Sequence, residues 1–294
     1  GGAGGAYTDV LRAGSQWDRL QALAEIKQLG GGSVAVAACA PDVVALLSDP
    51  DDKVARAACE ALGSMGAVGA DFADALVPLL QSGEDTRRCY AAGALGMMGT
   101  AAARHGGELA KLLTDGSASV RAAAVVAVGS VGMSDEAEGV ARCMADANPA
   151  VARGAITALA LLGAEGRKFS GDVAKRLADP SREVKSSAVL YFTKFNDQAL
   201  ANAAPLCQLL GDGDAGVRHG VVRLFESLKD KALPMAPQAA KLLSHSDPGC
   251  KAAAALAIGG VGPAAAEAHA SAVAALLRDA SEDTAQVPLC LAGV

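Results

Sequence analysis

Large apolar residues return along this chain with a spacing of about 33 residues. The stretches LLSDPDDKVARAACEALGSMG from Leu46, LLTDGSASVRAAAVVAVGSVG from Leu112 and LLGDGDAGVRHGVVRLFESLK from Leu209 align without gaps. Self-similarity at such a period is typical of repeat proteins. With Val120 as the reference, the equivalent positions are Asp18, Val54, Arg87, Val120, Val151, Val184, Val217, Cys250 and Thr284. Nine units therefore cover nearly the whole chain.

The first half of each unit predicts an amphipathic helix. Seven residues before the reference stands a large apolar residue in every unit: Leu11, Leu47, Leu80, Leu113, Met144, Leu177, Leu210, Leu243 and Leu277. Four residues earlier, at helical spacing, most units repeat an apolar residue: Val43, Leu76, Leu109, Val140, Val173, Leu206 and Val273. Such spacing indicates the buried stripe of a first helix.

The second half predicts another helix. Three residues before the reference, eight units carry an N-cap residue: Ser15, Asp51, Ser117, Asn148, Ser181, Asp214, Asp247 and Ser281. Offsets 0, 4, 8 and 11 are mostly apolar and share one helical face. At offset 12 stand Gly30, Gly66, Gly99, Gly132, Gly163, Asn196 and Gly262, which fit a left-handed residue ending the helix.

Such a unit cannot bury both apolar faces alone, so we expect neighbouring units to stack. The pattern predicts an all-α, right-handed α-solenoid of about nine two-helix repeats, forming a single domain over residues 1–294 with its last repeat incomplete. Leu276 and Leu277 would then be under-covered. We therefore expect the native chain to continue, or a partner to cover this end.

The repeat resembles the HEAT-repeat (armadillo-like) family, in particular its short Ala/Gly-rich branch similar to bilin lyases. The resemblance is closest at D-x-x-x-x-V-R-x-A-A-A-x-A-L-G, where the family places an Asp before the second helix and an Arg six residues later. The pairs in this sequence are Asp115 with Arg121, Asp179 with Lys185, and Asp212 with Arg218. We interpret them as a structural ladder in which each cation reaches an Asp of its own or an adjacent unit. A basic strip that binds an acidic partner is the alternative.

Composition narrows the class of partner. Hydrophobic residues make up 51% and aromatic residues 3%, which favours closely packed helices. The net charge is −6 and no Lys/Arg run occurs, so we expect protein partners and no nucleic acid. The longest apolar run, Ala252 to Gly262, is too short to span a bilayer. Seven cysteines without a C-x-x-C pair predict reduced thiols and an intracellular, cytoplasmic protein, with an organelle as the alternative.

We find no pattern for catalysis, a metal or a cofactor. None of the four histidines stands in an H-x-x-x-H or H-E arrangement. Deoxyhypusine hydroxylase resembles this chain in architecture but uses His-Glu pairs as iron ligands, which this sequence lacks. Cys89 follows Arg87 and Arg88, whose charge would favour a thiolate.

The pattern therefore favours a non-catalytic scaffold or adaptor in a larger assembly. We expect offsets 2, 6 and 9 of the second helices to line a concave, partner-binding face that includes Ala122, Val126, Gly129, Arg153, His219, Arg223 and Glu226. Recurrent glycines such as Gly96 and Gly129 fit either tight helix packing or the floor of this face. A bilin lyase or chaperone and a purely structural spacer are the alternative functions.

Overall fold

The computed structural model describes residues 3–278, with side chains from Tyr7 to Leu276. Every regular element in that range is an α-helix or a 3-10 helix. The reference position at Thr284 and the expected N-cap Ser281 lie outside the described residues. Contacts divide the chain into two compact units, residues 1–168 and 169–294. A single continuous domain remains a prediction.

In residues 3–168, five long helices correspond to the predicted second helices: α2 (Gln16–Leu29), α4 (Asp52–Ser64), α7 (Asp85–Met98), α9 (Ala118–Val131) and α11 (Pro149–Leu161). The first-helix segments are α1 (Ala3–Ala13), α3 (Val34–Ala45), α5 (Ala67–Ala70), α6 (Val77–Leu80), α8 (Gly106–Lys111), α10 (Ala137–Cys143) and α12 (Ala164–Arg167). Short 3-10 helices adjoin them: η1 (Gly30–Gly32), η2 (Leu46–Ser48), η3 (Ala73–Leu76), η4 (Gly99–His105), η5 (Leu112–Thr114) and η6 (Ser134–Glu136).

In residues 169–278, the second helices are α14 (Arg182–Lys194), α17 (Ala215–Leu228) and α19 (Pro248–Val261). The remaining α-helices are α13 (Ser170–Lys175), α15 (Asn196–Ala201), α16 (Ala203–Gln208), α18 (Ala236–Ala240), α20 (Pro263–Ala268) and α21 (Ala270–Arg278). The 3-10 segments are η7 (Arg176–Ala178), η8 (Leu209–Gly211), η9 (Lys229–Met235) and η10 (Lys241–Ser244).

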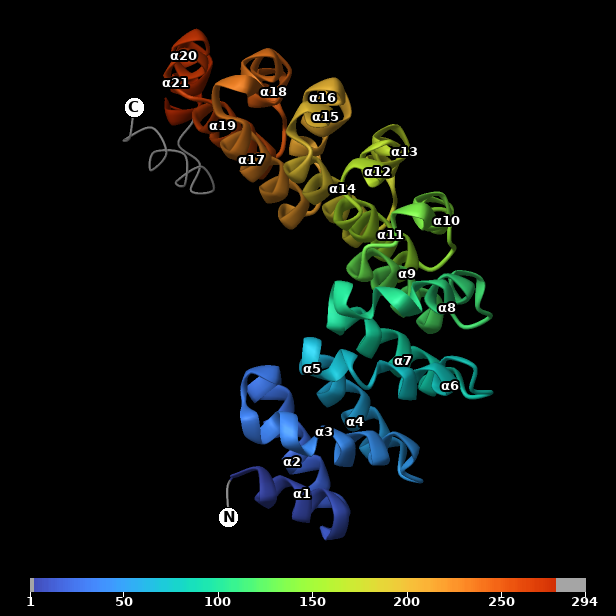
Figure 1. Ribbon diagram of the computed structural model, residues 1–294. Helices are drawn as coiled ribbons and strands as arrows, with labels where there is room; N and C mark the ends of the chain where they lie inside the picture. Colours follow the sequence, from blue (N-terminus) through green and yellow to red (C-terminus); the bar gives the residue numbers. More distant parts are fainter. Residues whose placement is uncertain (1–2, 279–294) are drawn as a thin grey trace. The chain divides into compact units, whose positions relative to one another are not determined.

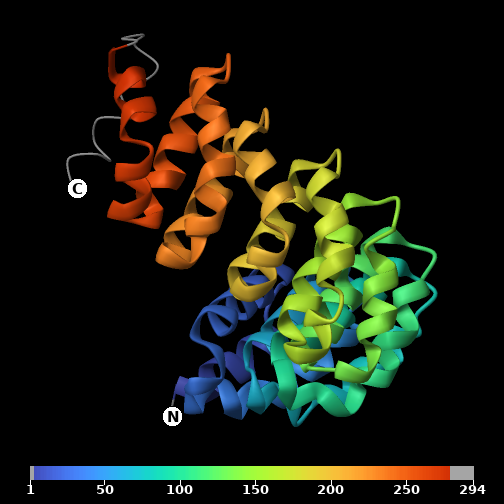
Figure 2. The same ribbon diagram turned by 90° about the horizontal axis from the view of Figure 1, so that it is seen from above.

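Each unit has two layers of helices. In the first unit, α4, α7, α9 and α11 pack successively against one another, and α6, α8 and α10 lie on one side of them (Figure 1). In the second unit, α14, α17 and α19 form the equivalent row, and Figure 2 shows its helical hairpins side by side. The predicted all-α solenoid is confirmed.

The N-caps confirm the predicted register. Each described second helix begins directly after its expected cap residue. The side chains of Ser15, Asp51, Asn148, Ser181, Asp214 and Asp247 accept a hydrogen bond from the first turn. Glu84 and Ser117 occupy the same position without such a bond. The local cap chemistry thus starts the helices where the sequence places it.

The predicted apolar columns form the core. In the described repeats, the predicted apolar residues seven and eleven positions before the reference, and those eight positions after it, are all buried. In the column eleven residues after the reference, Leu29 is 53% exposed and Phe195 is half-buried, whereas the other described residues are buried. The expectation that Leu276 is under-covered is wrong: it is 5% exposed, since α21 packs against η10 of the preceding repeat. The Leu277 side chain lies outside the described residues.

The ends of the second helices follow the prediction in six repeats. Gly30, Gly66, Gly99, Gly132, Gly163 and Gly262 all have positive φ. Gly132 has left-handed helical angles, φ 81° and ψ 31°. Lys229, at the same offset, also has a positive φ of 50°. The expectation for Asn196 is wrong, because that residue begins α15 and has no positive φ.

The first helices are shorter and more broken than predicted. In the fourth repeat, η4, α8 and η5 replace one continuous α-helix. Gly106 and Gly107 stand where that helix would begin, and glycine is a weak helix former. No helix among residues 3–278 combines the length and apolar character needed to cross a bilayer.

Candidate functional site

The turn between the two helices of a repeat is closed by a side chain five residues before the reference. The Oδ1 atom of this Asp accepts the N–H two residues later at 2.8–2.9 Å: Asp49, Asp115, Asp146, Asp179 and Asp212. Ser82 accepts the equivalent bond with Oγ at 3.2 Å, and His245 with Nδ1 at 3.0 Å. This residue therefore fixes the turn, which explains its recurrence.

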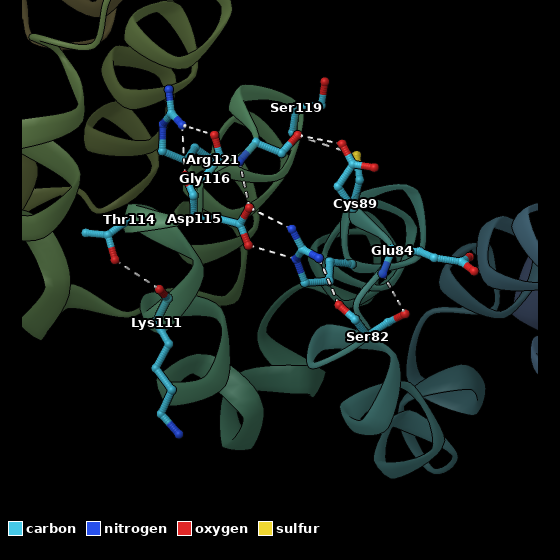
Figure 3. Close-up of polar contacts among 12 residues, drawn as sticks. Ser82, Glu84, Cys89, Lys111, Thr114, Asp115, Gly116, Ser119 and Arg121 are labelled. Carbon is cyan, nitrogen blue, oxygen red and sulfur yellow. Dashed lines mark hydrogen bonds and ion pairs between the residues drawn. The ribbon is translucent and has the colours of Figure 1, made fainter.

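The cation one residue after the reference connects consecutive repeats. Arg88 donates to both carboxylate oxygens of Asp115 at 2.8 and 2.9 Å (Figure 3). Arg121 donates to both oxygens of Asp146 at 2.7 and 3.0 Å. Arg19 pairs with Asp49 at 3.0 Å. In the second unit, Lys185 pairs with Asp212.

These contacts change the predicted ladder pairs. Arg121 reaches Asp115 of its own repeat through the backbone carbonyl, at 2.8 Å, and not through the carboxylate. Arg218 contacts the carbonyl of Asp212 in the same way, at 2.7 Å. Asp179 does not pair with Lys185. Its Oδ2 atom instead lies 3.6 Å from Nη1 of Arg176. Each side-chain ion pair, called a rung below, thus joins the cation of one repeat to the Asp of the next repeat.

The rungs keep their carboxylates charged. The hydrogen bond from Arg88 is the largest cause that lowers the pKa of Asp115, and the bond from Arg121 does the same for the pKa of Asp146. Side chains of the second pair are only 21% and 12% exposed. Charge-assisted bonds of this geometry stabilise the junction between repeats and occupy the cations that could otherwise bind a partner.

One rung is replaced on both sides at once. Ala55 stands in α4 at the cation position, and the next turn carries Ser82 in place of Asp. Ser82 retains the turn-closing hydrogen bond to the N–H of Glu84. The junction between α4 and the turn before α7 therefore lacks this rung, and Asp52 at the start of α4 instead pairs with Arg87 of α7 at 3.1 Å.

The exposed face of the second-helix layer is partly apolar. In the first unit it carries Met97 on α7, Val126 on α9 and Leu161 on α11, which are 48%, 39% and 48% exposed. They stand at offsets 10, 6 and 10. Arg153 at offset 2 of α11 is exposed, and Ala122 at offset 2 of α9 is half-buried. The sequence interpretation included Val126 but missed Met97 and Leu161, because it placed the third exposed position at offset 9.

Gly129, at offset 9, does not belong to this face. It is buried, and a Cβ there would lie 2.6 Å from Cα of Ala158 on α11. Gly96 meets Ala127 in the same way, with Cα at 2.9 Å, and Gly63 meets Ala94 at 3.0 Å. Offset 9 lies about 60° around the helix from offset 6, on the side of the next second helix. These glycines let neighbouring backbones approach closely.

The second unit exposes a comparable set. His219, Arg223 and Glu226 are exposed on α17, as the sequence interpretation expected of a binding face. Leu190 on α14 is 57% exposed at offset 6 and was missed. The repeat register itself could have found Met97, Leu161 and Leu190, since each is a large apolar residue at an offset that other repeats fill with polar or small residues.

The opposite layer carries a cavity of about 520 Å³ between the first-helix segments α8 and α10. Leu113, Gly139 and Cys143 line it, and the Arg121–Asp146 pair stands at one wall. Leu113 is only 7% exposed, which agrees with its predicted place in the core.

The described cysteines are free, and their environments do not favour thiolates. Burial raises the pKa of Cys59 to about 12 and that of Cys207 to about 11. For Cys89, burial and then Asp85 raise the pKa, so the expected effect of the neighbouring arginines is wrong. Cys290 lies outside the described residues. Among the residues that the structure describes, no group of three His, Cys, Asp or Glu side chains could hold a metal ion.

Comparison with family models identifies the repeats. The model for HEAT repeats matches residues 7–96 and 73–161, which together span more than half of the chain. The chain belongs to the HEAT-repeat family. A comparison with curated proteins gives no match. The resemblance to the bilin-lyase branch stays a prediction.

Structural comparison supports the same fold for this HEAT-repeat chain. An engineered protein is 20% identical, with a TM-score of 0.55, over 99% of this chain and 88% of the other. Kap95p in a structure with RanGDP is 14% identical, with a TM-score of 0.73, over 96% of this chain and 44% of Kap95p. A homology model of the AP-3 complex is 15% identical, with a TM-score of 0.69, over 94% and 53%. The chain thus spans about half the length of these two natural proteins, and the likeness is one of fold.

Proposed function

We propose that this protein is a non-catalytic scaffold or adaptor subunit that binds another protein through the exposed face of its second helices. In the first unit this face, called the second-helix face below, consists of the exposed side chains of α4, α7, α9 and α11. The observation that carries the proposal is the exposure of Met97, Val126 and Leu161 on three consecutive helices. Single exposed apolar residues are common, but grouped ones mark interaction sites.

The neighbouring packing supports this assignment. Val126 leans on α11 where Gly154 leaves room, since a Cβ on Gly154 would lie 3.2 Å from Cγ2 of Val126. Met97 lies beside Gly63 of α4, since a Cβ on Gly63 would lie 3.1 Å from Cβ of Met97. Both residues thus lie against a neighbouring helix at a position where that helix carries a glycine. A pre-positioned apolar surface costs a partner little ordering on binding.

The comparisons support the same class of function by analogy. The titles of two similar structures describe Kap95p with RanGDP and with Nup1, both protein complexes, and a third is the AP-3 complex. We infer from the fold and the exposed face that this chain also acts within an assembly.

The test is site-specific photocrosslinking from Val126 in cells, followed by measurement of affinity with the purified partner. We expect Val126→Arg to lower that affinity at least tenfold with an unchanged thermal midpoint. Lys111→Glu, on the first-helix layer, is the control and should bind normally. Loss of binding in the control but not in Val126→Arg would place the interface on the other layer. Visible absorbance from a bound tetrapyrrole in the purified protein would favour the lyase alternative.

A further inference from the structure

The second-helix face carries a basic cluster at its α4 side. Arg56 donates to Glu60 at 2.8 Å, and Lys27 of α2 donates to the same carboxylate at 2.7 Å. The Arg56 guanidinium also lies 5.3 Å from the centre of the Tyr90 ring on α7. Two cations share one anion, so the cluster has a net charge of +1. The Arg56 side chain is 57% exposed and is held in place by both contacts.

A second positive charge stands at the α11 side. Arg153 is exposed and occupies the same offset in α11 as Arg56 does in α4. It forms no ion pair with any residue in the described part of the chain. Because both arginines are at offset 2 of helices in one row, they face the same side of the layer. Three helix spacings separate them, which is roughly 25–30 Å at 8–10 Å per spacing.

The residues of α7 and α9 that stand between the two arginines are uncharged. At offsets 2, 6 and 10, helices α7 and α9 carry Cys89, Gly93, Met97, Ala122, Val126 and Ser130. A Cβ on Gly93 would have no neighbour within 4 Å, so the space above it is open. The carboxylates at the nearby helix starts are Asp52 and Glu84, which share Arg87, and Asp85, which accepts a hydrogen bond from the Ser117 hydroxyl.

We propose that the second-helix face binds an extended segment of another protein that has a small apolar centre and an acidic residue near each end. The inference rests on the proposed function and names the class of its partner. An extended chain advances about 3.3 Å per residue, so eight or nine residues reach from Arg56 to Arg153. The segment crosses α7 and α9, its apolar centre contacts Val126 and Met97, and its carboxylates meet the two guanidinium groups.

Anisotropy of a labelled nine-residue peptide, Asp-Glu-Val-Ala-Leu-Ala-Val-Glu-Asp, tests the inference on the full chain. We expect measurable binding that weakens with added salt. A peptide with lysine in place of every acidic residue should bind at least tenfold more weakly. Arg56→Glu and Arg153→Glu should each lower the affinity at least fivefold, and the double variant further.

The matched control is Arg142→Glu, a charge reversal of an exposed arginine on α10 in the other layer. It should leave peptide affinity unchanged, and circular dichroism should show all variants folded. Equal binding of the acidic and basic peptides, or equal loss in Arg142→Glu and Arg153→Glu, would overturn the inference. If Val126→Arg weakens binding of the crosslinked partner while Arg56→Glu and Arg153→Glu leave that binding unchanged, the partner class is wrong and the proposed function stands. If Val126→Arg has no effect either, both fail.

Discussion

Arg121 donates from Nε and Nη2 to the two carboxylate oxygens of Asp146, at 2.7 and 3.0 Å, and so ties α9 of one repeat to the turn that begins α11 of the next. The same guanidinium also donates to the carbonyl of Asp115 in its own repeat. The Arg121 side chain therefore contacts both of the repeats that meet at this junction. The relation recurs at Arg88 and Asp115, one repeat earlier.

Removal of this rung should lower stability moderately. Arg121→Ala should reduce the free energy of unfolding by about 1–2 kcal/mol, because hydrogen bonds to charged groups are worth about 1.5–3 kcal/mol and this pair is partly screened by solvent. Urea unfolding measures the effect. Arg142 is exposed and forms no ion pair with any residue that the structure describes, so Arg142→Ala is the control and should change it by less than about 0.5 kcal/mol.

The two roles of Asp146 can be separated. Asp146→Asn keeps an oxygen that accepts the N–H of Asn148 but removes the charge that pairs with Arg121. Asp146→Ala removes both, so we expect it to cost about 1 kcal/mol more than Asp146→Asn. Equal losses in the two variants would show that the turn-closing bond contributes nothing.

A new rung should stabilise the α4–α7 junction. Ala55→Arg combined with Ser82→Asp recreates the pair that the equivalent positions form elsewhere, and the new Asp can still close its turn. We expect a favourable coupling of about 0.5–1 kcal/mol in a double-mutant cycle, with Ser82→Asp alone close to neutral and Ala55→Arg alone destabilising, because Ala55 is only 5% exposed. Additive single effects would argue that the geometry of this junction differs from the others.

The rungs should also give the protein an acid-sensitive stability. Both Asp115 and Asp146 have lowered pKa values in the fold, chiefly through Arg88 and Arg121. Their contribution is fully present above the ordinary Asp pKa of about 3.9 and is lost as the pH falls through the lowered values. The thermal midpoint of the native chain should therefore decrease when the pH is lowered below about 4. Arg121→Ala should show a smaller fall, and an identical pH profile would contradict the assignment.

Two glycines of the second helices, Gly129 and Gly93, give a paired test of helix packing. Gly129→Ala puts a Cβ 2.6 Å from Cα of Ala158, so the helices must separate and we expect a loss of about 1–3 kcal/mol. Gly93→Ala, in an α7 position with open space, should instead stabilise by up to about 1 kcal/mol. Similar effects in both variants, measured by urea unfolding, would show that close approach does not govern these sites.

The register of the repeat could be predicted from short-range patterns in the sequence. Cap residues such as Ser15 and Asp214 act within one helical turn, and buried columns such as the one containing Leu113 follow from helical periodicity. Both depend on neighbours close along the chain, so the start of every described second helix and nearly all of the core could be predicted. Val126 and the exposure of Arg153, His219, Arg223 and Glu226 follow from the same periodicity.

Tertiary structure alone decided what each helix meets. The partner of Arg121 is Asp146 and not the carboxylate of Asp115, because the distance across a junction depends on how consecutive repeats stack. Gly129 is buried because α11 lies against that side of α9, which a helical wheel of α9 cannot show. Asn196 begins α15, because the C-cap of α14 falls one residue earlier, at Phe195, whose φ is −111° and ψ 70°. Periodicity specifies which face of a helix is apolar, whereas contacts between helices depend on their separation and rotation, and those are fixed only when neighbouring side chains pack together.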